Sequence, residues 1–291
     1  MLIPPGFESN SVVTRLGTLV YYRSSQSSEP DKTALIFLHG FGGGSSAYEW
    51  SKVYPAFAER YRILAPDLLG WGRSDHPERR YQLEDYLETL ADFLGQVSSK
   101  PVIAVASSLT AAMTIRLAIA QPQLFQALIL VAPAGLSDFG ENYGNFFSQL
   151  VSLPVVEQLL YSGAIATEVG IRSFLEQRQF AEAKRISAEI VTAYLQSAQQ
   201  PNAAAAALAF VRGDLCFDVA EGIEQLSTPT ALIWGSAAQF TPPAIGERLM
   251  ALNPQAFQSL EILAGVGLTP QLEVPAVMIG LIERWLRGLT E

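Results

Sequence analysis

Histidine and cysteine are the scarce residues of this chain. Among its 291 residues there are two histidines, His39 and His76, and one cysteine, Cys216. A single cysteine excludes a disulfide framework and a multi-cysteine metal site. Two distant histidines, without a carboxylate–histidine cluster, argue against the usual transition-metal sites. We therefore expect no metal and no cofactor, and imidazole chemistry is limited to two positions.

Basic residues are also in the minority. The chain has 19 Lys and Arg against 28 Asp and Glu, a formal net charge of -9 at pH 7. Nucleic-acid binding requires a basic face for the phosphates, so we expect no nucleic-acid partner. Residues 1–6 contain no basic segment followed by a long apolar run, and we therefore expect no signal peptide and a cytoplasmic location.

One stretch approaches the length of a membrane-spanning helix. Residues 102–120 are almost free of charge and about as long as such a helix. The stretch changes character in the middle, from a β-branched run at 102–105 to an Ala-rich segment with helical spacing at 109–120. This pattern predicts a strand, a tight turn and a helix, so we expect no membrane span.

Apolar residues are plentiful and occur in short runs that alternate with amphipathic segments. The runs, typical of parallel strands covered on both faces, are 18–22, 34–38, 61–65, 102–105, 127–131, 230–234 and 258–263. The segments with helical spacing are 48–60, 83–97, 109–120, 242–252 and 275–287. Strands that alternate with helices predict right-handed βαβ units, and therefore an α/β fold with a mostly parallel sheet.

The alternation stops between about residues 136 and 225. This region contains helical patterns without convincing strands, at 143–153, 155–163, 166–176, 180–199 and 203–211. A helical insertion in an α/β domain is most often a cap over the C-terminal edge of the sheet. We assign 1–135 and 226–291 to the core and 136–225 to the cap. The apolar side chains of the cap either bury only the cap's own core or also line an apolar ligand pocket.

A glycine-rich loop follows the second of these apolar runs. Residues 38–44 read Leu-His-Gly-Phe-Gly-Gly-Gly, and glycine lets backbone N–H groups approach a ligand closely. A phosphate-binding loop is the alternative, but no Gly-Lys-Ser/Thr follows. The pattern favours an oxyanion-hole loop, in which the amide of Phe41 faces a developing negative oxygen.

A candidate nucleophile lies at the turn from strand to helix, in Val-Ala-Ser-Ser-Leu-Thr at 105–110. A nucleophile on such a turn is strained and exposed, and the next amide, that of Leu109, lies at a helix N-terminus. Ser108 occupies the serine position of the Gly-x-Ser-x-Gly pattern, with Ala106 and Thr110 at the glycine positions. By itself this motif is weak evidence, because a serine after a strand is usually a helix N-cap.

Further motifs follow in a fixed order. Asp-Leu-Leu-Gly-Trp-Gly-Arg-Ser stands at 67–74, Pro-Thr-Ala-Leu-Ile-Trp-Gly at 229–235 and Gly-Val-Gly at 265–267. Together with the glycine-rich loop and the Ser108 turn, this order resembles the α/β-hydrolase superfamily, in its capped, epoxide-hydrolase and esterase-like branch. The resemblance implies a sheet of about eight strands, with the active site under the cap at the C-terminal ends of the strands.

The resemblance also locates the acid and the base of a Ser–Asp–His triad, and both are replaced. The acid position, three residues after Trp-Gly, holds Ala238, and the base position, after Gly-x-Gly, holds Leu268. Only Ser108 remains. Loss of the base typically costs on the order of 10⁴–10⁶ in turnover.

No other residue is an obvious substitute for the base. The resemblance implies that His39 braces the oxyanion loop, and His76 lies in a polar turn where we expect it at the surface. Some relatives take their acid after the sixth strand, which indicates Asp138, but an acid without an imidazole to orient has no role in this mechanism.

Three functions remain open. The first is binding of a small apolar molecule with little or no hydrolysis, because Leu268 makes the pocket drier; His39, Gly40, Phe41, Ser108 and Leu268 would line that pocket. The second is an esterase-like hydrolase that acts on a small ester or related carbonyl compound through Ser108. The third is a protein-interaction scaffold that presents an apolar patch on the cap.

Overall fold

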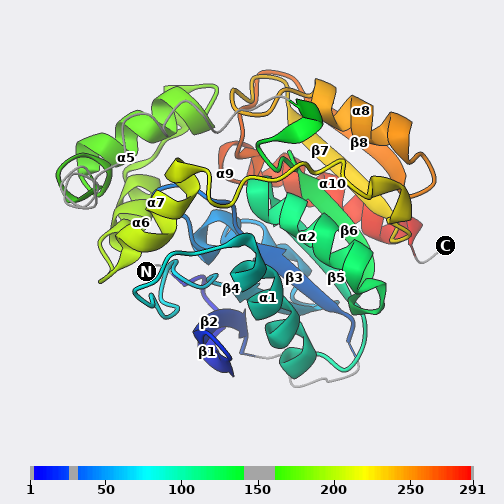
Figure 1. Ribbon diagram of the computed structural model, residues 1–291, viewed down its shortest axis with the longest axis horizontal. Helices are drawn as coiled ribbons and strands as arrows, with labels where there is room; N and C mark the ends of the chain where they lie inside the picture. Colours follow the sequence, from blue (N-terminus) through cyan, green and yellow to red (C-terminus); the bar gives the residue numbers. More distant parts are fainter. Residues whose placement is uncertain (1–2, 26–31, 141–160, 290–291) are drawn as a thin grey trace.

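The core of the molecule is an eight-stranded mixed sheet (Figure 1). The computed structural model describes residues 3–25, 32–140 and 161–289. The strands are β1 (Phe7–Thr14), β2 (Gly17–Ser24), β3 (Ala34–Leu38), β4 (Arg62–Pro66), β5 (Val102–Ser107), β6 (Phe125–Val131), β7 (Thr230–Gly235) and β8 (Phe257–Leu263). Their order is β1-β2-β4-β3-β5-β6-β7-β8. The pairs β1–β2 and β2–β4 are antiparallel and the others are parallel, which confirms the predicted fold class.

The central strands are buried over their whole length. Every residue of β3, β5 and β7 is buried, because helices cover both faces of a parallel sheet. The seven apolar runs predicted as strands are all strands, with bounds shifted by a few residues. The edge strand β1 was not predicted, because its sequence Phe-Glu-Ser-Asn-Ser-Val-Val-Thr is mostly polar. Backbone pairing with β2 over eight residue pairs holds it in place.

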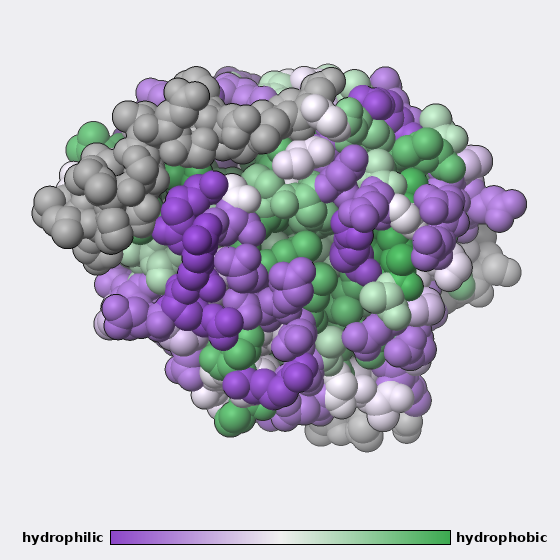
Figure 2. Space-filling view, viewed as in Figure 1, coloured by the Kyte–Doolittle hydropathy of each residue, from purple (hydrophilic) through white to green (hydrophobic). Residues whose placement is uncertain are grey.

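Helices cover the two faces of the sheet. They are α1 (Leu83–Val97), α2 (Ser108–Ala120), α8 (Ala244–Leu252), the short α9 (Pro270–Glu273) and α10 (Pro275–Gly288). In Figure 1, α1 and α2 lie in front of the sheet and α10 lies behind it. Figure 2 shows apolar residues at the centre of the front face, where α2 lies, bordered by hydrophilic residues. Arg116 of α2 forms an ion pair with Glu221, which lies in the segment before β7, at 2.9 Å.

Residues 102–120 fold as predicted, as β5, a tight turn and α2. No helix in the described parts of the chain combines the length and apolar character needed to cross a membrane.

The predicted helix at 48–60 is wrong. The chain forms two short 3₁₀ turns there, η1 (Ala47–Trp50) and η2 (Tyr54–Phe57), and Pro55 lies in the first turn of η2. The large side chains of Trp50, Tyr54 and Phe57 recur every three or four residues and are buried. This spacing serves separate 3₁₀ turns as well as a continuous helix, which explains the error.

The described part of the cap contains α5 (Glu168–Phe174), α6 (Ala188–Ala198) and α7 (Ala203–Arg212). Shorter turns are η5 (Tyr161–Ile165) and η6 (Leu175–Gln179), both π-helical, and η7 (Ala183–Arg185). The predicted helices at 143–153 and 155–163 lie largely outside the described residues. The single helix predicted at 180–199 is wrong, since α6 begins only after the N-cap Ser187.

The two ends of the insertion meet beside the sheet. The Phe217 amide donates to the Gly135 carbonyl at 2.8 Å, and residues 136 and 217 form a parallel bridge. The inserted segment thus leaves the sheet and returns to it at neighbouring points.

Candidate active site

Ser108 lies on a strained turn between β5 and α2. Its φ of 57° is in the left-handed region, which is unfavourable for residues with a Cβ. A Cβ at Gly40 would lie 3.4 Å from Ser108 Cβ, so the neighbouring loop approaches closely. The chain therefore has the geometry of a nucleophile elbow at the serine that the sequence indicates.

We expect Ser108→Gly to stabilise the protein. Glycine adopts this φ without a Cβ penalty, whereas the left-handed conformation costs other residues roughly 1–2 kcal/mol. The free energy of unfolding in urea should rise by about 1 kcal/mol after the entropic cost of glycine is subtracted. Ser108→Ala, which keeps the Cβ, is the matched control and should give no gain. Equal stabilities of the two variants would contradict strain at this residue.

His39 holds the oxyanion loop through both ring nitrogens. Its Nε2 accepts from the Leu68 amide at 3.0 Å, and its Nδ1 donates to the Gly40 carbonyl at 2.8 Å. Burial lowers the pKa of His39 to about 4, so the ring is neutral at pH 7. Because the C=O and N–H of a trans peptide point in opposite directions, the Gly40 carbonyl bond turns the Phe41 amide away from His39.

Two backbone amides are available for an oxyanion. Among the described residues, the Phe41 amide has no hydrogen-bond partner. The Leu109 amide lies in the first turn of α2, where N–H groups have no intrahelical acceptor. The Phe41 ring packs edge-on against Trp71 and Tyr86, with centroids 5.2 and 4.8 Å apart. These ring contacts fix the loop that carries the first amide.

The acid and base positions are neighbours at the C-terminal edge of the sheet. The Ala237 amide donates to the Val266 carbonyl at 2.9 Å, so the loops that carry Ala238 and Leu268 lie side by side. Both side chains are buried. In the described part of the chain, the Ser108 hydroxyl has no hydrogen-bond partner. The arrangement therefore presents a nucleophile without a described proton acceptor.

Glu273 connects the base loop to the cap. Its Oε1 accepts from the Gly267 amide at 2.6 Å, and its Oε2 accepts from the Ala181 amide at 3.1 Å and from Arg185 at 2.9 Å. The Leu268 amide in turn donates to the Gln179 carbonyl at 2.7 Å. The cap segment 179–185 is therefore fastened to the loop that would carry the catalytic histidine.

A buried polar network, which the sequence motifs did not reveal, lies beneath the oxyanion loop. We call Glu49, Ser107, Gln179, Tyr194 and Gln271 the Glu49 network. Glu49 accepts from the Gly40 amide at 2.9 Å and from the Tyr194 hydroxyl at 3.0 Å. Gln271 Nε2 donates to Ser107 Oγ at 3.2 Å and lies 3.4 Å from Glu49 Oε2.

The carboxyl group of Glu49 has an unusual environment. The residue is 1% exposed, and it forms no ion pair with a described Lys or Arg. Burial raises its pKa above the usual value, although hydrogen bonds from Gly40 and Tyr194 oppose the shift. No motif marks Glu49, because it lies in residues 48–60, where the spacing predicts an ordinary helix.

Asp138 and His76 lie apart from this chemistry. The Asp138 carboxylate accepts from the amides of Gly135, Leu136 and Val219, so it shapes the loop after β6. His76 is half-buried rather than at the surface, which corrects the expectation. Its Nε2 donates to the Gly72 carbonyl at 3.2 Å. No group of His, Cys, Asp and Glu that could hold a metal occurs among the described residues.

A cavity of about 320 Å³ lies between the cap and the oxyanion loop. Its lining is mostly apolar and includes Gly43, Trp71, Ile165, Ile171, Phe174 and Phe210. We call it the cap cavity. The cavity touches the oxyanion loop at Gly43. None of the five pocket residues that the sequence suggests is among its lining residues, which corrects that expectation: His39, Gly40, Phe41, Ser108 and Leu268.

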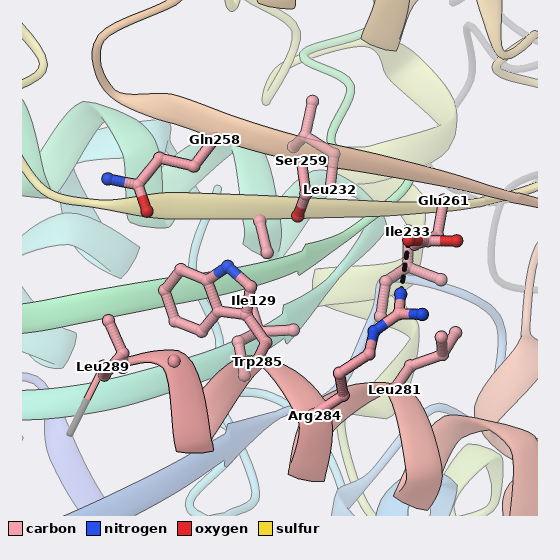
Figure 3. Close-up of a pocket in the computed structure, with 12 residues that line it drawn as sticks. Ile129, Leu232, Ile233, Gln258, Ser259, Glu261, Leu281, Arg284, Trp285 and Leu289 are labelled. Atoms are coloured by element: carbon pink, nitrogen blue, oxygen red, sulfur yellow. Dashed lines mark hydrogen bonds and ion pairs between the residues drawn. The ribbon is translucent and has the colours of Figure 1, made fainter. Parts of the chain in front are cut away.

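A second cavity, of about 360 Å³, lies on the face of the sheet between α10 and β6–β8 (Figure 3). Trp285 and Arg284 extend from α10 toward the strands, and Arg284 pairs with Glu261. Neither Ser108 nor the oxyanion loop contributes to its lining. This cavity is therefore separate from the candidate active site.

Comparisons with known proteins agree with this geometry. The model of the alpha/beta hydrolase family matches residues 35–280. An uncharacterised protein of Mycobacterium tuberculosis is 27% identical over 264 residues, which cover 87% of this chain and 75% of that protein. The strigolactone esterase of Pisum sativum is 36% identical over 121 residues, which cover 40% of this chain and 44% of the esterase.

A solved structure shows the same fold over nearly the whole chain. The 2-hydroxy-6-oxo-6-phenylhexa-2,4-dienoate hydrolase of Rhodococcus sp. strain RHA1 has a TM-score of 0.77 at 19% identity, covering 97% of this chain and 99% of that chain. With the family match over residues 35–280, the sheet order and the Ser108 elbow, this identifies the chain as a member of the α/β-hydrolase family.

Proposed function

We propose that this chain binds a small apolar molecule under its cap and hydrolyses it slowly or not at all. One observation carries the proposal: the base position holds Leu268, and the Ser108 hydroxyl has no hydrogen-bond partner among the described residues. A serine hydroxyl is a weak nucleophile at neutral pH and requires a positioned base. The neutral His39 ring is held by Leu68 and Gly40, which leaves it unsuited to replace that base.

The cap cavity supports the binding part of the proposal. Its volume of about 320 Å³ falls at the lower end of the range for small-molecule sites, and such sites are mostly apolar with a few polar groups. A Cβ at Gly43 would lie 2.9 Å from Ile165 Cγ2, so the oxyanion loop and the apolar wall are in contact. A ligand there could have its apolar body in the cavity and a polar atom at the loop.

A serine esterase is the second candidate. The strained elbow at Ser108 favours it, and so does the Phe41 amide, which has no hydrogen-bond partner among the described residues. The similarity to the strigolactone esterase of Pisum sativum also supports it. An oxyanion hole and substrate binding alone can give an acceleration of roughly 10³ over water. A scaffold has no comparable support, because the exposed large apolar residues described, Val13, Val169, Leu252, Ile262 and Val277, lie on separate elements.

Reaction with a fluorophosphonate probe separates the two candidates. We expect the rate of Ser108 modification to be at least about 10³-fold below that of an active serine hydrolase, because no described residue accepts the hydroxyl proton. Ser108→Ala gives the background, and intact-mass spectrometry measures the modified fraction. Rapid stoichiometric modification of Ser108 would overturn the proposal and support the esterase.

A further inference from the structure

The side-chain amide of Gln179 lies against the oxyanion loop although it belongs to the cap. Gln179 ends the π-helical turn η6, and its backbone carbonyl accepts from the Leu268 amide at 2.7 Å. The residue is 3% exposed. A Cβ at Gly42 would lie 2.8 Å from Gln179 Nε2, so only glycine at position 42 leaves room for this amide.

Only one end of the amide has a partner among the described residues. Gln179 Oε1 accepts from the Tyr194 hydroxyl at 3.1 Å, whereas Nε2 donates to no described group. Buried donors are nearly always paired, because the loss of hydration is otherwise uncompensated. The amide nitrogen is therefore a donor directed at the candidate site and available to a ligand.

The Glu49 network determines which end of the amide faces the loop. Tyr194 has one hydroxyl proton and two neighbouring oxygens, Glu49 Oε1 at 3.0 Å and Gln179 Oε1 at 3.1 Å. In both contacts the Tyr194 hydroxyl is the donor. A hydroxyl that donates to the Gln179 amide must face its oxygen, because the amide nitrogen is itself a donor. This contact holds Oε1 toward Tyr194 and leaves Nε2 toward the loop.

Phe174 lies between the amide and the cap cavity. A Cβ at Gly42 would lie 3.1 Å from Phe174 Cε1 and 2.8 Å from Gln179 Nε2. Phe174 lines the cavity, whereas Gly42 and Gln179 do not. The amide therefore lies beside the cavity wall that Phe174 and Gly43 form.

We propose that Gln179 recognises the carbonyl oxygen of a neutral ligand, such as a ketone, ester or lactone, whose apolar body occupies the cap cavity. This inference rests on the proposed function. Nε2 and the Phe41 amide would donate to the oxygen from two sides. A neutral carbonyl suits the site better than a carboxylate, because the Glu49 network contains an acid and no cation. Arg178 lines the cavity, but its guanidinium lies over the Phe240 ring, 5.7 Å from the centroid.

A matched pair of probes tests this role. Butylbenzene supplies the apolar body alone, and 4-phenylbutan-2-one adds a ketone to the same skeleton; ligand-observed NMR gives both dissociation constants. Gln179→Met should weaken ketone binding about fivefold, which corresponds to one neutral hydrogen bond, and should leave butylbenzene binding unchanged. Gln196→Met is the control, because Gln196 is exposed on α6 and does not line the cap cavity, and it should change neither constant.

Other results would contradict either the role of Gln179 or the proposed function. If Gln179→Met weakens both probes equally, or neither, Gln179 does not recognise the carbonyl, while binding of butylbenzene still supports the proposed function. If neither probe binds the parent chain, the proposed function fails and this inference fails with it. If 4-phenylbutanoate binds more tightly than the ketone, the ligand is an anion and Arg178 is its partner.

Discussion

Replacing Ala238 by aspartate and Leu268 by histidine together should raise the hydrolysis of p-nitrophenyl butyrate at least about 100-fold above the parent chain. The serine elbow and the two candidate oxyanion amides are already present. The loops that carry positions 238 and 268 are joined by the bond from Ala237 to Val266. A triad contributes about 10⁴–10⁶ in turnover, so 100-fold requires only a small fraction of full restoration.

The single variants should each give much less than the double variant. A histidine without an acid is not held in the productive tautomer, and an acid without a histidine has nothing to orient. We expect less than about tenfold from either, and therefore strong non-additivity. Ser108→Ala in the double variant should abolish the gain. A gain that survives this replacement would show that the new histidine acts elsewhere and that the assignment of positions 238 and 268 is wrong.

The second large effect is expected at Glu273, where Glu273→Ala should lower the free energy of unfolding by about 3 kcal/mol. The carboxylate is fully buried and accepts from two backbone amides and from Arg185. Hydrogen bonds to a charged group are worth roughly 1.5–3 kcal/mol each, and the removal leaves the Gly267 and Ala181 amides without this acceptor. Urea unfolding monitored by tryptophan fluorescence measures the loss.

Glu182→Ala is the matched control for Glu273→Ala. Glu182 pairs with the same arginine, Arg185, at 2.6 Å, but its side chain is 37% exposed. Solvent screens an exposed ion pair, so the control should lose much less stability than Glu273→Ala. Hydrogen exchange at Ala181 should accelerate only in the Glu273 variant. Similar losses in the two variants would mean that the buried carboxylate does not hold the cap segment 179–185 to the base loop.

Local patterns in the sequence were sufficient for the core of the fold. The runs that became β3, β5 and β7 are continuous and apolar, and a strand buried on both faces requires that composition. The polar edge strand β1 has no such requirement, because backbone hydrogen bonds to β2 hold it. The helix predicted at 48–60 is wrong because the spacing of its apolar residues is misleading. Trp50, Tyr54 and Phe57 have helical spacing, but they belong to two separate 3₁₀ turns.

The candidate site was predictable where its parts are local in sequence. The oxyanion loop, the Ser108 turn and the replacements at 238 and 268 each lie within a short motif. The Glu49 network joins residues that are far apart: 145 positions separate Glu49 from Tyr194, and 222 separate it from Gln271. No periodicity or motif records such a contact.

The sequence by itself determined the α/β fold and its mostly parallel sheet, because strand and helix patterns depend on residue type at short spacing. The same short spacings predict a nucleophile at Ser108 and a base position that holds Leu268. Only the tertiary structure decided that His39 is held through both ring nitrogens and that the cap places Gln179 beside Gly42. Those facts depend on how distant segments pack. Packing fixes which buried polar groups find partners within the chain, and which, like Gln179 Nε2, have none among the described residues.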